Sequence, residues 1–369
     1  MPIPIVDSHI HLFPQTHLST LAWHGPDNPL GAQHSIDEYR AATQSVPTSP
    51  DQTAPSTSAS STYLRGFVFL ETDRISSLDE NDAARGWTHA LDELSLLTRI
   101  VLGEPIPGEG HQPEDRSLCL GIVPWAPVPA GPDALARYMS LAKQRARTDE
   151  VWKKVRGVRY LLQDKPAGTM FAPGFIDGLK WLGRQKLVFD LGVDARQGGL
   201  WQLREAVEMM QKVYDESKEE ERVVFVINHL CKPNLRLPYS SPESITTHPD
   251  FIEWKTLITA MAAHPTTYMK LSGALSELPP LSPTPEPDID ALVDRLQPWT
   301  DAVFDAFGPE RVLFGSDWPV CNIGGGGNTV SWQRWRTIVE AVLDRRGLTD
   351  DQKAGVWGGV AVKAYGLEI

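Results

Sequence analysis

Short apolar runs bounded by turn residues alternate with longer amphipathic stretches along most of the sequence. We interpret eight of the runs as strands: Ile3–Phe13, Leu64–Asp73, Cys119–Val128, Val155–Leu162, Leu187–Val193, Arg222–His229, Thr267–Gly273 and Val312–Asp317. A helix-like stretch follows each of the last seven: Ser77–Val101, Pro132–Arg147, Phe175–Arg184, Leu200–Lys218, Phe251–His264, Asp290–Phe307 and Ser331–Arg345. Strands that alternate with helices in this way indicate βα units and a parallel sheet. The order of the elements therefore predicts the α/β fold class.

The number of repeats favours a closed sheet. Runs such as GFVFLE and VVFVIN are apolar on both faces, as parallel strands covered by helices should be. Eight βα repeats in 369 residues fit a single (β/α)8 TIM barrel with long βα loops better than an open doubly wound sheet. The first strand is not followed by a GxGxxG motif, which argues against a dinucleotide-binding fold.

One segment departs from the repeat pattern. Residues Val46–Thr62 (VPTSPDQTAPSTSASST) are rich in serine, threonine and proline and offer little apolar surface to bury. We predict a flexible low-complexity insertion before the second strand, within a barrel that spans residues 1–369. A connection from a helix to a strand lies on the barrel face away from the chemistry, so we expect no functional role for this segment.

Composition excludes several classes of function. The chain carries 47 acidic and 35 basic residues, a formal charge of −12, and shows no basic run that could follow a phosphate backbone. We expect no nucleic-acid partner, no membrane span and no signal peptide, and we predict a cytoplasmic protein. Cys119, Cys231 and Cys321 are too few and too widely spaced for a disulfide framework or a zinc knuckle. The predicted partner is a small molecule; the sequence leaves open a monomer or a homo-oligomer.

The two ends of the chain carry the clearest candidates for a catalytic site. Because side chains alternate along a strand, Asp7, His9 and His11 should project from one face of the first strand. Paired imidazoles can hold a divalent cation, although two satisfied core histidines are the alternative. Asp317 directly follows the eighth strand, where it could bind a metal, accept a proton from water, or cap a turn before Pro319. The first and eighth strands are neighbours in a closed barrel, so these groups should meet.

Other strand ends add polar side chains. His229 could polarise a carbonyl, orient water or bind metal; its alternative is a hydrogen bond to a backbone carbonyl. Glu71 and Asp73 lie on one face of the second strand, where one of them could bind the metal or both could belong to a turn. Arg159 could bind a substrate oxygen or form an ion pair with a neighbouring strand.

Charges and tryptophans elsewhere in the barrel add weaker candidates. Asp190 and Lys270 are charges within apolar strands, so each needs a partner or a function. Tryptophans near the expected rim, such as Trp125 and Trp318, could stack on a sugar-like ring or simply pack between helix and barrel.

The motifs VDSHIHLF, LRGFVFLETD, VRGVRYLL, FDLGV, NHLCKP, MKLSG and FGSDWPV occur in this order over nearly the whole chain. Together they resemble the amidohydrolase superfamily, and within it the amidohydrolase-2 branch of sugar-acid lactonases. The resemblance implies a TIM barrel that opens a lactone ring with activated water, and it places the family's histidines and aspartate on His9, His11, His229 and Asp317. Many superfamily members carry a histidine or bridging lysine on strand four or five, where this chain has Arg159 and Asp190. We therefore expect one divalent ion, zinc first, rather than two.

A division of roles follows for lactone hydrolysis. His9, His11, Glu71 and Asp317 are the expected metal ligands, and Asp317 is also the general base, with His229 as the second catalytic residue. The expected substrate-binding residues are Arg159, Tyr160, Trp125, Trp318 and Lys270. Related pyrone-dicarboxylate lactonases work without metal, so metal-independent catalysis is one alternative. A metal-dependent decarboxylase of aromatic or unsaturated acids and a non-catalytic binding barrel are the others.

Overall fold

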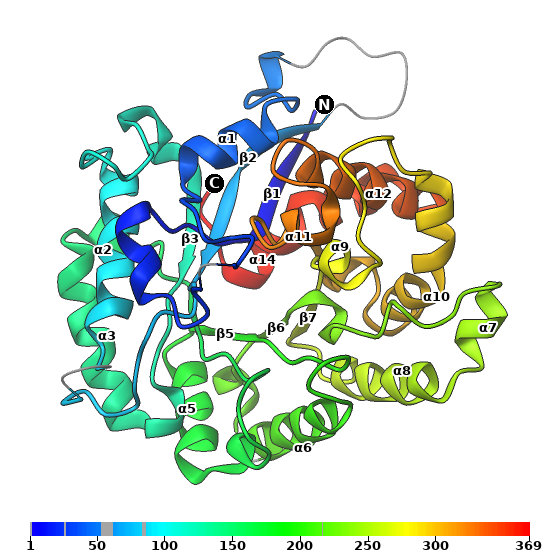
Figure 1. Cartoon of the computed structure of the whole chain (residues 1–369). Helices are drawn as coiled ribbons and strands as arrows, with labels where there is room; N and C mark the ends of the chain where they lie inside the picture. The colour runs from blue at the N-terminus through cyan, green and yellow to red at the C-terminus, as the bar shows by residue number, and fades with distance from the viewer. Residues whose placement is uncertain (1, 26, 53–61, 83–85, 216) are drawn as a thin grey trace.

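The computed structural model describes residues 2–25, 27–52, 62–82, 86–215 and 217–369. These residues form eight parallel strands. The strands lie at the centre of the molecule and the helices surround them (Figure 1). The strands are β1 (Ile3–Ile10), β2 (Thr62–Leu70), β3 (Cys119–Val123), β4 (Gly157–Arg159), β5 (Val188–Leu191), β6 (Phe225–Ile227), β7 (Thr267–Leu271) and β8 (Val312–Phe314). Each falls within one of the eight runs interpreted as strands, apart from the first two residues of β2.

The strands form two parallel groups, β1–β2–β3 and β4–β5–β6–β7–β8, in sequence order. Isolated parallel bridges join the groups at both seams. Ile122 of β3 pairs with Val155 ahead of β4, and Ile10 of β1 pairs with Trp318 beyond β8. The amide of Asp317 also donates to the carbonyl of His9 at 2.9 Å. These links bring the first strand to the last, and the fold is the predicted (β/α)8 barrel.

The helices of the outer ring follow the strands as the sequence pattern predicted. They are α2 (Thr88–Leu102), α3 (Pro132–Ala146), α5 (Pro173–Arg184), α6 (Trp201–Asp215), α8 (Pro249–Ala262), α10 (Ile289–Phe307) and α12 (Ser331–Arg345). The first begins eleven residues later than Ser77, with residues 83–85 outside the described part of the chain. Shorter helices are α1 (Ile36–Thr43), α4 (Asp149–Trp152), α7 (Pro242–Thr246), α9 (Ala274–Glu277), α11 (Asn322–Gly325), α13 (Asp350–Ala354) and α14 (Val360–Tyr365).

Two apolar clusters stabilise the barrel. The larger lies between the strands and the outer helices. The smaller combines strand residues such as Val6, Val226 and Leu313 with α14, which covers the end of the barrel at which the strands begin. Gly358, just before α14, allows this close approach: a Cβ there would lie 2.6 Å from the carbonyl oxygen of Pro4. The interior is thus filled at one end, which leaves the carboxyl ends of the strands for the site.

The predicted insertion lies between α1 and β2, as expected for a helix-to-strand connection, but its residues 53–61 are outside the described part of the chain. All three cysteines are buried and free. Within the described residues, no helix combines the length and the apolar composition needed to cross a membrane.

Candidate active site

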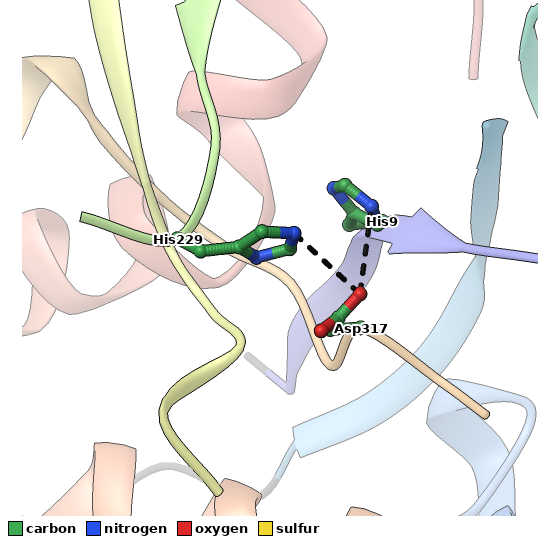
Figure 2. Close-up of side chains that lie close together, drawn as sticks. All are labelled: His9, His229 and Asp317. Atoms are coloured by element: carbon green, nitrogen blue, oxygen red, sulfur yellow. Dashed lines mark ion pairs between the residues drawn. The ribbon is translucent and has the colours of Figure 1, made fainter. Parts of the chain in front are cut away.

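Three imidazoles converge on one carboxylate at the carboxyl ends of the strands. Oδ1 of Asp317 lies 3.6 Å from Nε2 of His9, 3.7 Å from Nε2 of His11 and 3.5 Å from Nε2 of His229. Figure 2 shows His9 reaching the carboxylate from β1 and His229 reaching it from the loop that follows β6. All four side chains are at least nine-tenths buried. The structure thus brings together the histidines and the aspartate that the sequence suggested.

An irregularity in β1 decides which side chains enter this cluster. Val6 lies in the smaller apolar cluster, inside the barrel, and the register between β1 and β2 shifts after Asp7. Asp7 therefore does not share a face with His9, contrary to the prediction from strict alternation. Its carboxylate instead accepts hydrogen bonds from Tyr39 at 3.0 Å and from Trp332 at 2.8 Å, in the outer helices α1 and α12. The shift in register turns His9 toward the interior, because one displaced residue reverses the side-chain alternation.

A left-handed turn places His229 beyond the end of β6. Residues 229–232 all have positive φ, between 47° and 60°, and the amide of Lys232 donates to the carbonyl of His229 at 2.7 Å. Such conformations are strained for residues other than glycine. Amides of Ala195 and Arg196 donate to the carbonyls of Cys231 and Lys232 and hold the turn in place.

A glycine after β7 makes room for the imidazole of His229. Gly273 has φ 69°, and a Cβ at this position would lie 2.6 Å from the imidazole ring. Nδ1 of His229 lies 2.8 Å from the hydroxyl of Ser272, which fixes the orientation of the ring. The positions of both residues after β7 therefore determine that Nε2 of His229 points toward Asp317.

Contacts to Nδ1 orient the imidazoles of His11 and His9. Nδ1 of His11 lies 3.0 Å from the carbonyl oxygens of Leu70 and Glu71, so this nitrogen carries the proton and Nε2 is left as an acceptor. Nδ1 of His9 lies 3.2 Å from Nζ of Lys270, and the two Nε2 atoms of His9 and His11 are 3.1 Å apart.

The pKa values of His9, His229 and Asp317 are all lowered. Burial and the charge of Lys270 hold the pKa of His9 well below its usual range. Burial lowers the pKa of His229 to about 3, although the charge of Asp317 opposes this shift. Burial alone would raise the pKa of Asp317, but His229, His11 and Lys232 outweigh it and the pKa is lowered. At neutral pH, His9 and His229 are therefore neutral and Asp317 is a carboxylate.

This donor set fits a divalent cation. One nitrogen each from His9 and His229 and one oxygen from Asp317 lie within 4.8 Å of one another. Oδ2 of Asp317 is buried and has no hydrogen-bond partner among the described residues. Imidazole and carboxylate ligands suit zinc and other transition-metal ions, and a buried carboxylate oxygen without a partner is costly unless a ligand satisfies it.

Glu71 is committed to an ion pair. Its Oε1 accepts from Nε of Arg159 at 2.5 Å, and its Oε2 accepts from the amide of Asp73 at 2.5 Å. Nη2 of Arg159 also donates to the carbonyl of Glu71 at 2.6 Å. Glu71 is thus absent from the group of side chains that could share a cation, unlike His9, His229 and Asp317. Of the two roles considered for Arg159, the structure shows the ion pair, while the guanidinium still lines the cavity described next.

A cavity of about 470 Å³ opens above the cluster. His11, His229, Asp317 and Arg159 form its floor, and loops that follow the strands form its walls. The polar walls are Asn28, Thr72, Asp73, Gln163, Asp164 and Lys232, and the apolar walls include Phe13, Trp23, Leu30, Leu161, Val320 and Ile323. The volume lies within the range of sites that enclose small molecules.

The amino-acid sequence from residue 126 to 367 matches the sequence model of the family described as Amidohydrolase. L-rhamnono-gamma-lactonase of Scheffersomyces stipitis is 34% identical to this chain over 365 residues, which cover 98% of each chain. The chain belongs to the amidohydrolase family. L-fucono-1,5-lactonase of Burkholderia multivorans is 29% identical over 230 residues, which cover 61% of this chain and 68% of that one.

Solved amidohydrolase structures share the fold. A Burkholderia multivorans amidohydrolase with bound HEPES superimposes with a TM-score of 0.67 at 22% identity, covering 99% of each chain. A second structure of a Burkholderia multivorans amidohydrolase, with bound zinc, gives a TM-score of 0.65 at the same identity and the same coverage. A divalent metal ion is typical of the amidohydrolase family.

The aromatic residues predicted to bind the substrate of this amidohydrolase lie in two different places. Tyr160 and Trp125 line a small cavity of about 60 Å³ beside the main one, and both cavities share Asp73. Trp318 is fully buried, donates from Nε1 to Asn328 at 2.7 Å and does not line the main cavity. The expectation that Trp318 stacks on a substrate is therefore corrected, because its ring packs in the core against Tyr39.

Lys270 also lies away from the wall of the main cavity. It is fully buried, and its Nζ donates to Oδ1 of Asp190 at 2.5 Å and faces His9. Oδ2 of Asp190 accepts from the hydroxyl of Tyr365 at 2.7 Å. The expected contact of Lys270 with substrate is corrected to a contact with His9. The side chain of Lys270 points into the barrel from β7, and its ammonium group lies next to Nδ1 of His9.

Lys232 and Asp164 are charged residues of the cavity that the strand pattern did not single out. Lys232 lines the cavity together with His229, and its charge lowers the pKa of Asp317. In a turn closed by an i to i+3 hydrogen bond, residues three apart lie on the same side, which accounts for the pairing of His229 with Lys232. The NHLCKP motif contains both residues, but a left-handed turn of non-glycine residues has no sequence pattern that would predict it.

Proposed function

We propose that this protein hydrolyses the lactone of a sugar acid, with the cluster around Asp317 as its catalytic centre. The observation that carries the proposal is the convergence of three imidazoles on one buried carboxylate at the floor of a cavity of small-molecule size. Relatives named as L-rhamnono-gamma-lactonase and L-fucono-1,5-lactonase support the substrate class.

The centre is proposed to hold one divalent ion, zinc first, through His9, His229 and Asp317, with His11 beside them. When bound there, such an ion supplies a Lewis acid that polarises a carbonyl and lowers the pKa of water. The neutral imidazoles and the partnerless Oδ2 of Asp317 support this assignment. Glu71, which we expected as a further ligand, is proposed instead to orient Arg159.

The side chains of the floor supply the proton transfers. Asp317, ionised at neutral pH, accepts a proton from the attacking water and returns it to the ring oxygen that leaves. His229 would hold the ion through Nε2, since its Nδ1 is held by Ser272, and this places the polarised carbonyl or water next to Asp317. Lys232 and Arg159 bring positive charge to the cavity, where negative charge develops on the carbonyl oxygen.

The walls of the cavity suit a polyhydroxylated ring. Asn28, Gln163, Asp73 and Asp164 offer donors and acceptors for hydroxyl groups, and Trp23 offers an apolar ring for a sugar face. Burial and the charge of Glu71 raise the pKa of Asp73 to about 6, so this carboxyl can accept or donate a hydrogen bond near neutral pH.

A pH-indicator assay on a panel of lactones tests the function directly. Each γ- and δ-aldonolactone, together with a pyrone and a muconolactone, is incubated with the purified protein before and after treatment with a chelator. We expect acid release from an aldonolactone, a loss of activity after chelation and recovery with zinc. Turnover that survives complete removal of metal would contradict the metal assignment, and carbon dioxide release from an aromatic acid without lactone hydrolysis would contradict the reaction class.

A further inference from the structure

A second cavity lies at the opposite end of the barrel from the catalytic centre. Its volume is about 670 Å³. It is lined by residues at or just before the starts of β4, β5 and β6, among them Val155, Val188 and Val224, and by the end of α14. Catalytic side chains lie at the carboxyl ends of the strands, so this cavity is separate from the site described above.

The charged side chains of this cavity are all basic. Lys153, Arg156, Lys186, Arg222 and Lys363 line it, and among the described residues no aspartate or glutamate does. This is the reverse of the whole chain, in which 47 acidic residues outnumber 35 basic ones. Five like charges around one cavity repel one another, and in an acidic protein they form a local positive field that an anion would relieve.

Among the residues that the structure describes, Arg156 is the one of these five side chains with an ion pair to a carboxylate. Arg156 pairs with Glu368 at 3.3 Å, but the side chain of Glu368 is 75% exposed. Lys186 donates to the backbone carbonyl of Glu220. In the part of the chain that the structure describes, Nε of Arg156 and Nε of Arg222 are buried without a hydrogen-bond partner. Guanidinium groups with free donors are suited to bind carboxylate or phosphate oxygens.

The same cavity has apolar and aromatic walls. Trp152, Trp181, Met139 and Leu187 line it beside the basic residues. The volume falls within the range of small-molecule sites, and a bare inorganic anion would leave most of it unfilled. Basic groups next to indole rings suit an anion that carries an organic body.

We propose that this cavity binds a multiply charged organic anion, with Arg156 and Arg222 on its phosphate or carboxylate groups and Trp152 and Trp181 against its organic part. The penultimate residue Glu368 occupies Arg156 in the free protein, and the anion takes its place. The proposal does not depend on lactone hydrolysis, because no residue of the catalytic cavity takes part.

Isothermal titration calorimetry on the full chain tests the proposal with three probes. Inorganic phosphate supplies the charge alone, adenosine monophosphate adds a planar body to a phosphate, and tricarballylate adds a carbon chain to three carboxylates. We expect one of the two organic anions to bind at least about tenfold more tightly than inorganic phosphate. If neither organic anion binds below about 5 mM, or if neither binds more tightly than phosphate, the proposal is overturned.

Two sets of variants assign the binding to this cavity. Arg156→Met with Arg222→Met removes both guanidinium groups and should weaken binding by at least about tenfold. Lys153→Met with Lys363→Met changes only exposed side chains, so it tests the same charge dependence if the arginine variants fail to fold. Lys255→Met, an exposed residue of α8 outside the cavity, is the control and should leave the affinity within about twofold. Equal affinity of the wild type and a folded cavity variant would place the anion elsewhere and refute the assignment.

Discussion

Nδ1 of His9 and Nζ of Lys270 lie 3.2 Å apart inside the barrel, and neither side chain is exposed to solvent. Burial lowers the pKa of Lys270 to about 8, although the charge of Asp190 opposes the shift. Asp190 in turn accepts from Tyr365, so hydrogen bonds connect the imidazole of His9 with the helix that closes the other end of the barrel. The position of His9 therefore depends on an ion pair that does not contact the cavity.

The first prediction concerns this buried ion pair. Lys270→Met should lower the free energy of unfolding by about 3–5 kcal/mol, because it leaves the carboxylate of Asp190 buried without its cation. The double variant Lys270→Met with Asp190→Asn should recover part of this loss, since asparagine removes the charge and still accepts from Tyr365. Urea denaturation of the single variants and the double variant measures the coupling. If the loss of unfolding free energy in the double variant equals the sum of the losses in the two single variants, Lys270 and Asp190 do not interact.

Substitution of the carboxylate at the centre tests the proposed general base. Asp317→Asn should lower kcat by about 10²–10⁴-fold while the melting temperature and the circular dichroism spectrum stay close to those of the wild type. Asp250→Asn, on the exposed side of α8, is the matched control and should keep the activity. A variant that keeps wild-type turnover of a confirmed lactone would remove Asp317 from the mechanism.

Lys232 should act through its charge. Lys232→Met should lower kcat/KM by about tenfold, and Lys232→Arg should retain more of it, because the charge near Asp317 is kept. Loss of the charge should also raise the pKa of Asp317, so the fall in activity at acidic pH should begin at a higher pH in the methionine variant. The pH–rate profiles of the three proteins test this. An unshifted acidic limb would indicate that Lys232 serves packing alone; Lys212→Met, on the surface of α6, provides the control.

A buried histidine should make stability depend on pH. Nδ1 of His17 lies 2.8 Å from Nη1 of Arg74, and burial together with the charge of Arg74 lowers the pKa of His17 to about 3. The unfolded chain takes up a proton below about pH 6.5, whereas the folded chain does so only near its lowered pKa. The stabilisation is therefore complete above about pH 6.5 and is lost as the pH falls toward 3.

Melting curves of the wild type and His17→Gln test whether the stabilisation by His17 is lost as the pH falls. The difference in melting temperature between the two proteins should shrink between about pH 7 and about pH 4, because glutamine does not titrate in this range. A difference that stays constant or grows toward acidic pH would show that His17 is not held neutral in the folded protein.

The sequence determined the architecture and the histidines that meet around Asp317. Alternation of apolar runs and helical stretches is a local property. The sequence therefore located the eight strands within its apolar runs and, apart from the start of α2, predicted the seven outer helices close to their observed bounds. His9, His229 and Asp317 could be chosen because the carboxyl ends of all strands of a barrel meet on one face, which makes residues far apart in sequence neighbours in space.

Only the tertiary structure decided which way individual side chains point and what they contact. The shift in register after Asp7 arises from pairing with β2, and the left-handed turn before Lys232 depends on hydrogen bonds from the loop after β5. The partners of Glu71 and Lys270 come from other strands, and the basic cavity gathers residues between 139 and 366. Local sequence carries the periodicity of strands and helices, whereas charge pairing, burial and strained turns are set by contacts between distant segments.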